Sequence, residues 1–209
     1  MHLLLTDRLS CPRCGPAFGL ILLADRMEER RVRDGTLGCP NCRDGFPIRD
    51  GFGDLRAPPR GELPAGRAGP PAPADPTAAD RLQALLGVAE GPGTLLLTGS
   101  AARIAATLAD RIPGVEVVAL DADMALWPEA PRVSRMAARP GIPFFSRTLR
   151  GVAVDGALGA RWLEEAARVV APLSRVVVTT APDDAEAVLA GGGLHVLASE
   201  GGTVVAARG

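Results

Sequence analysis

The stretch Thr94–Asp110, TLLLTGSAARIAATLAD, decides the fold. It opens with apolar and β-branched residues, which predict a buried strand. Small residues around Gly99 then predict a tight turn, and Ile104, Leu108 and Ile112 recur at helical spacing. A strand, a turn and an amphipathic helix in this order are typical of the start of a nucleotide-binding domain. Glycines usually let the backbone of such a turn approach a ligand, but this turn holds only one.

Strands and helices alternate through the rest of the second half. A helix is predicted over Pro76–Glu90, with Asp75 as its N-cap, and another over Ala157–Leu173. Further strands are predicted at 114–123, 131–136, 150–156, 174–180, 194–199 and 202–208. Gly201–Gly202 predicts a hairpin between the last two. The alternation predicts a doubly wound α/β domain with a mostly parallel sheet and an antiparallel edge strand.

Composition and charge give no support to a nucleic-acid-binding, membrane or secreted protein. The chain has 209 residues, 47% of them hydrophobic, which is enough for a substantial core. Its net charge of −1 gives no electrostatic reason to expect direct binding to nucleic acid or to a membrane surface. The apolar runs near the N-terminus are too short for a signal peptide or a membrane span. We therefore expect a cytoplasmic protein.

All four cysteines lie near the N-terminus, as two C-x-x-C pairs: Cys11 with Cys14, and Cys39 with Cys42. This spacing is typical of a structural zinc site with four thiolate ligands. The alternatives are two disulfides or free thiols, which a chain without a secretion signal does not favour. Four protein ligands leave no open position, so this zinc would hold structure and not catalyse.

The segments around the cysteines predict a small β-ribbon. Strands are expected over 17–25 and 30–38, the second interrupted by a turn at Asp34–Gly35. The runs LTDRLSCPRCG, VRDGTLGCPNC and FPIRDGFGDL resemble the zinc ribbon of the small transfer-RNA methyltransferase activators. The resemblance covers about residues 1–56. It implies a possible protein partner, because members of that family stabilise a methyltransferase domain.

Residues 57–75 separate the two halves with a proline-rich run that predicts an extended linker. A proline-rich recognition peptide is the alternative. The sequence thus predicts a zinc-ribbon domain at 1–56, a linker at 57–75 and an α/β domain at 76–209. We expect the ribbon to dock on the second domain through an apolar face.

The second domain resembles the S-adenosylmethionine-dependent methyltransferases with a Rossmann-like sheet. Carried over position by position, the loop Thr98, Gly99, Ser100 and Ala102 corresponds to their glycine-rich cofactor loop, and Asp121 to their ribose-binding acid. Thr98, Ser100 and Ala102 stand where that family has glycine, Leu96 where it has an acid, and Leu173–Ser174 where it has two glycines. Asp155, at the end of a predicted strand, is either a functional group or a turn residue.

Two functions follow from these resemblances. The first is an S-adenosylmethionine-dependent methyltransferase with a fused zinc ribbon, its substrate undefined and its glycine loop substituted. The alternative is a non-catalytic methyltransferase-like scaffold, a pseudoenzyme, that binds a protein or RNA partner. The substitutions at Leu96 and in the loop weigh against S-adenosylmethionine as a cofactor, because they remove a counter-ion and add side chains. Whether the chain is an enzyme stays open at this point.

Overall fold

The structure is a computed structural model that describes residues 1–64 and 76–209. In the first segment a short helix, α1 (Leu3–Thr6), precedes the strands. Strands β1 (Ser10–Cys11) and β2 (Gly15–Gly19) form a separate antiparallel pair. The remaining strands of this segment are β3 (Ile21–Glu28), β4 (Arg31–Gly38), β5 (Gly45–Arg49) and β6 (Phe52–Arg56).

The second segment alternates helices and strands, as predicted. Its helices are α2 (Pro76–Leu86), α3 (Ala105–Arg111), α4 (Ala160–Val169) and α5 (Ala185–Gly191). Its strands are β7 (Gly93–Thr98), β8 (Val115–Leu120), β9 (Val133–Arg139), β10 (Leu149–Asp155), β11 (Val170–Thr179), β12 (His195–Glu200) and β13 (Thr203–Ala207). Three 3₁₀ helices follow strand ends: η1 (Gly99–Ile104), η2 (Ala122–Leu126) and η3 (Gly156–Leu158). No helix in 1–64 or 76–209 is long and apolar enough to cross a membrane.

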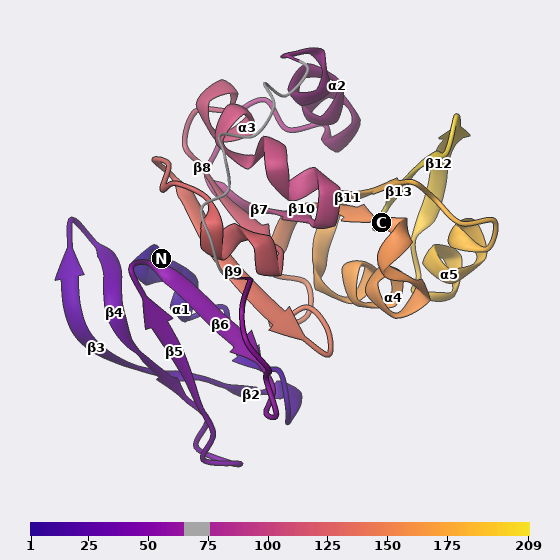
Figure 1. Cartoon of the computed structure of the whole chain (residues 1–209). Helices are drawn as coiled ribbons and strands as arrows, with labels where there is room; N and C mark the ends of the chain where they lie inside the picture. Colours follow the sequence, from indigo (N-terminus) through magenta and orange to yellow (C-terminus); the bar gives the residue numbers. More distant parts are fainter. Residues whose placement is uncertain (65–75) are drawn as a thin grey trace.

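The two segments build one sheet of eleven strands (Figure 1), in the order β12-β13-β11-β10-β7-β8-β9-β6-β5-β4-β3. Strands β11, β10, β7, β8, β9 and β6 run parallel to one another. Strand β13 pairs antiparallel with both β11 and β12, so the edge is antiparallel as predicted. Gly201 and Gly202, at φ +55° and +70°, make the predicted hairpin between β12 and β13.

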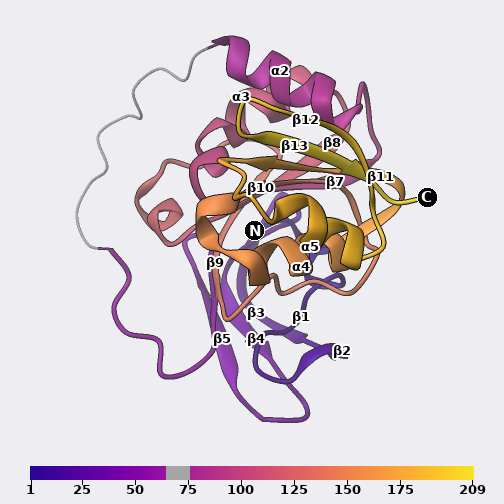
Figure 2. The same ribbon diagram turned by 90° about the vertical axis from the view of Figure 1, so that its right-hand side faces the viewer.

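Helices cover both faces of the second segment's sheet. Figure 2 shows α2 and α3 on one side and α4 and α5 on the other. Alternate strand residues therefore enter two cores: Leu95 and Val117 pack on the α2–α3 side, and Leu96 and Val118 on the α4 side. Helix α4 buries Leu163 on the second of these sides. Because both faces of these parallel strands are buried, their sequences are continuous apolar runs.

The ribbon docks on the second segment through strand pairing. Strand β6 runs parallel to β9, from Phe52 opposite Arg135 to Arg56 opposite Arg139. The ribbon's core residues Phe46, Ile48 and Leu55 belong to the same apolar cluster as Leu96 and Val118. The ribbon segment and the α/β segment therefore share a sheet and a core.

One predicted turn and one helix differ from the sequence prediction. The turn predicted at Asp34–Gly35 is wrong, because both residues lie inside β4 and pair with β3. The chain reverses between β3 and β4 at Glu29 and Arg30, both with positive φ. The short helix α5 was not predicted at all.

The predicted linker is only partly described. Its first residues are held against the ribbon: the Arg60 guanidinium lies over the Phe46 ring, 5.2 Å from its centroid, and donates to the Gly45 carbonyl. Leu63 packs on the α2–α3 core. The proposed N-cap Asp75 and the rest of the linker lie outside the described residues.

Candidate cofactor site and cysteine cluster

The four cysteines come together at one end of the ribbon. Cys11 and Cys14 flank the turn after β1, while Cys39 and Cys42 flank the turn after β4. All four sulfur atoms lie within 4.8 Å of one another. The Cys11–Cys42 and Cys14–Cys39 sulfur distances are 3.7 and 3.8 Å, and none of the four forms a disulfide.

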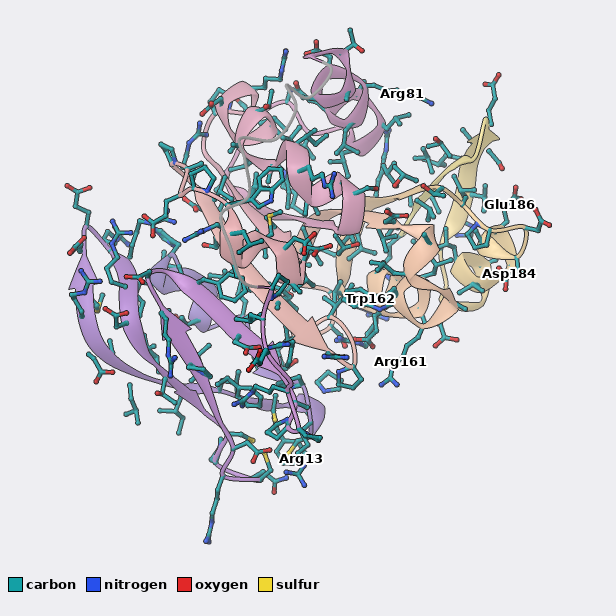
Figure 3. All side chains as sticks on the ribbon, in the orientation of Figure 1. Arg13, Arg81, Arg161, Trp162, Asp184 and Glu186 are labelled. Carbon is teal, nitrogen blue, oxygen red and sulfur yellow. The ribbon has the colours of Figure 1, made fainter. Side chains whose placement is uncertain are left out.

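The spacing of the sulfur atoms fits a tetrahedral metal. Four zinc–sulfur bonds of about 2.3 Å place the sulfurs roughly 3.8 Å apart. Backbone and side-chain donors approach the sulfurs, including the Cys14 amide to Cys11 and the Asn41 amide nitrogen to Cys14. Arg13, seen beside the sulfur atoms in Figure 3, pairs with Asp44 at 2.9 Å. Such donors and cations stabilise thiolates, the form in which cysteine binds metal.

The loop after β7 turns at once into the 3₁₀ helix η1. Gly99 has φ +57°, and a Cβ there would lie 2.8 Å from the Asp155 Cβ, so this position requires glycine. Thr98 is fully buried, and its hydroxyl accepts a hydrogen bond from the Asp155 amide. Ala102 is 1% exposed within the α2–α3 core. Thr98 and Ala102 therefore face packed protein.

Ser100 and Asp155 join the loops that follow β7 and β10. The Ser100 hydroxyl donates to Asp155 Oδ2 at 2.6 Å, and the Ser100 amide donates to the same oxygen at 3.1 Å. The Ala157 amide donates to the other carboxylate oxygen, so Asp155 also caps η3. Burial alone would raise the pKa of Asp155, but these hydrogen bonds hold it below the ordinary value.

These loops flank the place where an open α/β sheet binds its ligand. From β7 the chain adds β8 on one side, and it later adds β10 on the other side, so the gap between β7 and β10 is a topological switch point. Ligands of open α/β sheets bind beyond the carboxyl ends of the strands at such a point. Here the Ser100–Asp155 hydrogen bond bridges the two sides of the switch point. No sequence pattern linked Ser100 with Asp155, because the two are adjacent only in the folded sheet.

Asp121 lies apart from this bridge, beside a cavity of about 300 Å³. The cavity opens at the carboxyl ends of β8 and β9 and is also lined by Arg56, Leu158 and Trp162. One Asp121 carboxylate oxygen accepts from the Asp123 amide and so caps η2. Arg56, 6% exposed, is paired with Asp54 at 2.8 Å.

The other substituted positions have different surroundings. Leu96 is fully buried in the middle of β7, on the α4 side of the sheet. Leu173 is 89% exposed and has φ +60°, a conformation that glycine adopts without strain. Leu173 thus has a backbone conformation that favours glycine.

Comparison with solved structures agrees with this topology. The precorrin-6y C5,15-methyltransferase of Geobacter metallireducens matches with a TM-score of 0.51 at 14% identity, over 69% of this chain and 94% of that one. The fold is that of the methyltransferases. No protein-family model and no curated protein matches the sequence.

The other matches vary in their activity. The [4+2]-cyclase SpnF matches with a TM-score of 0.50 at 13% identity, over 66% of this chain and 64% of that one. A structure of the complex between the Haloferax volcanii Trm112 methyltransferase activator and a methyltransferase has a TM-score of 0.47 at 17% identity, over 57% of this chain and 69% of that one. Because a cyclase and a methyltransferase share the fold, the fold alone does not define the reaction.

Proposed function

We propose that the chain is a non-catalytic methyltransferase-fold scaffold with a structural zinc ribbon. The observation that carries the proposal is the hydrogen bond from Ser100 to Asp155 across the switch point of the sheet. A cofactor in this crevice would have to break that bond or lie beside it. Leu96 has no group that pairs with an ammonium ion, and the Thr98 hydroxyl is buried and accepts from the Asp155 amide. The residues at the crevice therefore do not fit a whole S-adenosylmethionine.

We propose zinc as the ion of the cysteine cluster, with Cys11, Cys14, Cys39 and Cys42 as its ligands. The sulfur spacing, the lack of disulfides among these four residues and the donors around the sulfurs support this assignment. A site with four thiolates has no open position for a substrate, so its role is structural. Reduced thiols in a zinc site also agree with a cytoplasmic location.

Titration with S-adenosylmethionine tests the scaffold proposal. We expect a dissociation constant above about 100 μM for the native chain, since a missing charged hydrogen bond alone costs about 1.5–3 kcal/mol, or one to two factors of ten. Ser100→Gly, which removes the bridging hydroxyl, should tighten binding several-fold. Ser199→Gly, an exposed change on β12, is the matched control and should have no effect. Low-micromolar binding by the native chain would overturn the scaffold proposal.

A working methyltransferase is the second candidate, and the cavity beside Asp121 favours it. A carboxylate at the end of the second parallel strand, next to Leu158 and Trp162, offers an acceptor for ribose hydroxyls and an apolar wall for a base. If this candidate is correct, Asp121→Asn should weaken S-adenosylmethionine binding at least tenfold. An unchanged affinity would remove this support.

The partner of the scaffold is a protein, which we propose binds at β3. This strand is the edge of the sheet in the described part of the chain, and its side chains Ile21, Leu23 and Met27 are 57%, 63% and 44% exposed. An apolar edge strand is suited to strand addition by a polypeptide. Leu23→Asp should abolish capture of that protein, while Leu173→Asp, in β11 near the other edge of the sheet, should not. A partner captured equally by both variants would exclude β3.

A further inference from the structure

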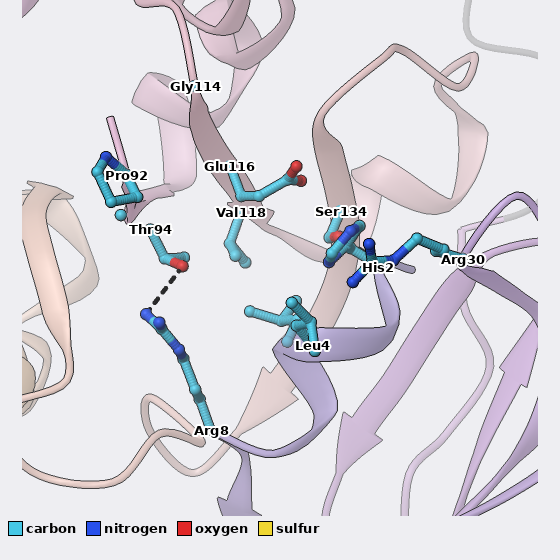
Figure 4. A pocket seen from close by; sticks show the side chains of 12 residues that line it. His2, Leu4, Arg8, Arg30, Pro92, Thr94, Gly114, Glu116, Val118 and Ser134 are labelled. Carbon is cyan, nitrogen blue, oxygen red and sulfur yellow. Dashed lines mark hydrogen bonds between the residues drawn. The ribbon is translucent and has the colours of Figure 1, made fainter. Parts of the chain in front are cut away.

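A second cavity, of about 290 Å³, lies at the opposite end of the parallel strands (Figure 4). It is placed where β7 and β8 begin, the length of β7 away from the Ser100–Asp155 bridge. One wall is formed by these strand ends and the other by α1 and Arg8. The ribbon segment and the α/β segment therefore build the cavity together.

Glu116, near the start of β8, lines this cavity. Its Oε2 atom is shielded from solvent and has no hydrogen-bond partner among the described residues. A carboxylate oxygen in that position costs stability unless a donor reaches it. The terminal torsion of a glutamate is broad, so a small rotation turns either oxygen toward the cavity. Glu116 is therefore a ready acceptor for a cationic N–H group.

Arg8 supplies the opposite charge. Its Nη1 donates to the Thr94 hydroxyl at 3.1 Å and to the Thr148 carbonyl at 3.4 Å, which fixes the guanidinium. Figure 4 shows Arg8 directed at Thr94, with the Glu116 carboxyl group extending toward another wall. A guanidinium has five N–H donors, and those on Nε and Nη2 suit a carboxylate.

Between the two charged groups the wall is apolar. Leu4 and Leu5 of α1 face the cavity from the ribbon side, and Val118 of β8 faces it from the sheet. Leu4 is 52% exposed, although its neighbour Leu5 is buried. A ligand with an aliphatic group would cover the exposed Leu4 side chain and remove it from water.

We propose that this cavity binds a free α-amino acid with an aliphatic side chain. Glu116 accepts from the ammonium group, Arg8 donates to the carboxylate, and the side chain packs on Leu4. The lining holds one acid, Glu116, and two arginines, Arg8 and Arg30. A zwitterion pairs with charges of both signs, whereas a simple amine leaves the guanidinium groups unpaired and a simple acid leaves Glu116 unpaired.

Calorimetric titration of the full chain with L-leucine tests the proposal. We expect a submillimolar dissociation constant for L-leucine. Two matched probes each lack one charged group: 3-methylbutylamine has no carboxylate, and 4-methylpentanoate has no ammonium. Each should bind at least tenfold more weakly. Equal binding of L-leucine and either probe, or no binding of L-leucine at about 10 mM, would overturn the proposal.

Glu116→Gln separates a ligand-binding role from a structural one. It should weaken L-leucine binding at least tenfold and leave the melting temperature of the free protein unchanged, because the Glu116 side chain is only partly buried. Glu164→Gln, an exposed change on α4, is the control and should alter neither value. A lower melting temperature for Glu116→Gln, with unchanged binding, would make Glu116 a structural residue and refute the site.

Discussion

Asp155 shows how one residue can serve local structure at a place where related folds bind ligands. It ends β10, caps η3 through the Ala157 amide, and holds η1 through two hydrogen bonds from Ser100. From the sequence, Asp155 was either a functional group or a turn residue. The structure shows Asp155 in a turn, where it caps η3. It also shows the hydrogen bond from Ser100 across the sheet, which neither alternative included.

The hydrogen bonds to Asp155 predict a pH-dependent contribution to stability. Asp155→Asn should lower the free energy of unfolding at pH 7 by about 1.5–3 kcal/mol, because it removes charge-assisted hydrogen bonds. The pKa of Asp155 is lowered in the folded state, so this difference is complete above the unfolded-state pKa of about 3.9. It should shrink as the pH falls through the lower folded-state pKa.

Urea unfolding of the native chain and of Asp155→Asn, between pH 7 and pH 3, measures this dependence. The exposed Asp184→Asn is the control, since its side chain makes no cap hydrogen bond in α5. A difference that stays constant down to pH 3 would show that the Asp155 charge does not carry the effect.

Among the elements, the strands of the second segment and the Gly201–Gly202 turn were predictable, but the turn at Asp34–Gly35 was not. Every predicted strand after residue 90 has a counterpart, because apolar runs of this length have few other ways to be buried. The turn predicted within the second ribbon strand was wrong because Asp34–Gly35 is a typical hairpin sequence that here stays extended. Pairing with β3 and β5 on both sides keeps Gly35 in the strand.

The same limit applies to the candidate site. Cysteine spacing predicted the cluster, since two C-x-x-C turns carry their own geometry. The bridge between Ser100 and Asp155 could not be predicted, because it depends on β7 and β10 being neighbours. The cavity lined by Glu116 and Arg8 depends on the docking of α1, for which the sequence has no local signal.

The turn between β3 and β4 leads to a prediction about the ribbon. Glu29 and Arg30 have φ +46° and +64°, the conformation of a two-residue hairpin that favours asparagine followed by glycine. The double substitution Glu29→Asn with Arg30→Gly should therefore relieve strain and raise the free energy of unfolding by about 1 kcal/mol. Thermal unfolding should show a melting temperature about 2–4 °C higher.

The corresponding change at the sequence-predicted turn provides the contrast. Asp34→Asn, followed by the native Gly35, creates the same favoured pair of residues there, but it removes the charge that pairs with Arg26 of β3 at 2.7 Å. It should therefore be neutral or slightly destabilising. Stabilisation by Asp34→Asn and none by the Glu29–Arg30 change would mean that the chain reverses at the sequence-predicted turn after all.

On the scale of the whole molecule, the two segments are more closely joined than a proline-rich linker implies. Two units of this kind are expected to unfold independently if only the linker connects them. Here β6 pairs with β9 along its whole length, and Leu55 lies in a cluster with Leu96 and Val118. Unfolding the ribbon would strip a strand from the sheet and expose the core beneath it.

We therefore predict a single cooperative unfolding transition for the zinc-loaded chain. Both tryptophans, Trp127 and Trp162, lie in the second segment, so their fluorescence reports on that segment, while zinc release into a chromogenic chelator reports on the ribbon. The two signals should change at the same denaturant concentration.

Leu55→Ala should lower the free energy of unfolding reported by both signals by about 2–5 kcal/mol, because it opens a cavity in the shared core. Leu173→Ala, an exposed change, should alter neither signal. Zinc release at a lower denaturant concentration, with the fluorescence unchanged, would mean that the shared strand pairing does not couple the segments and that the ribbon unfolds alone.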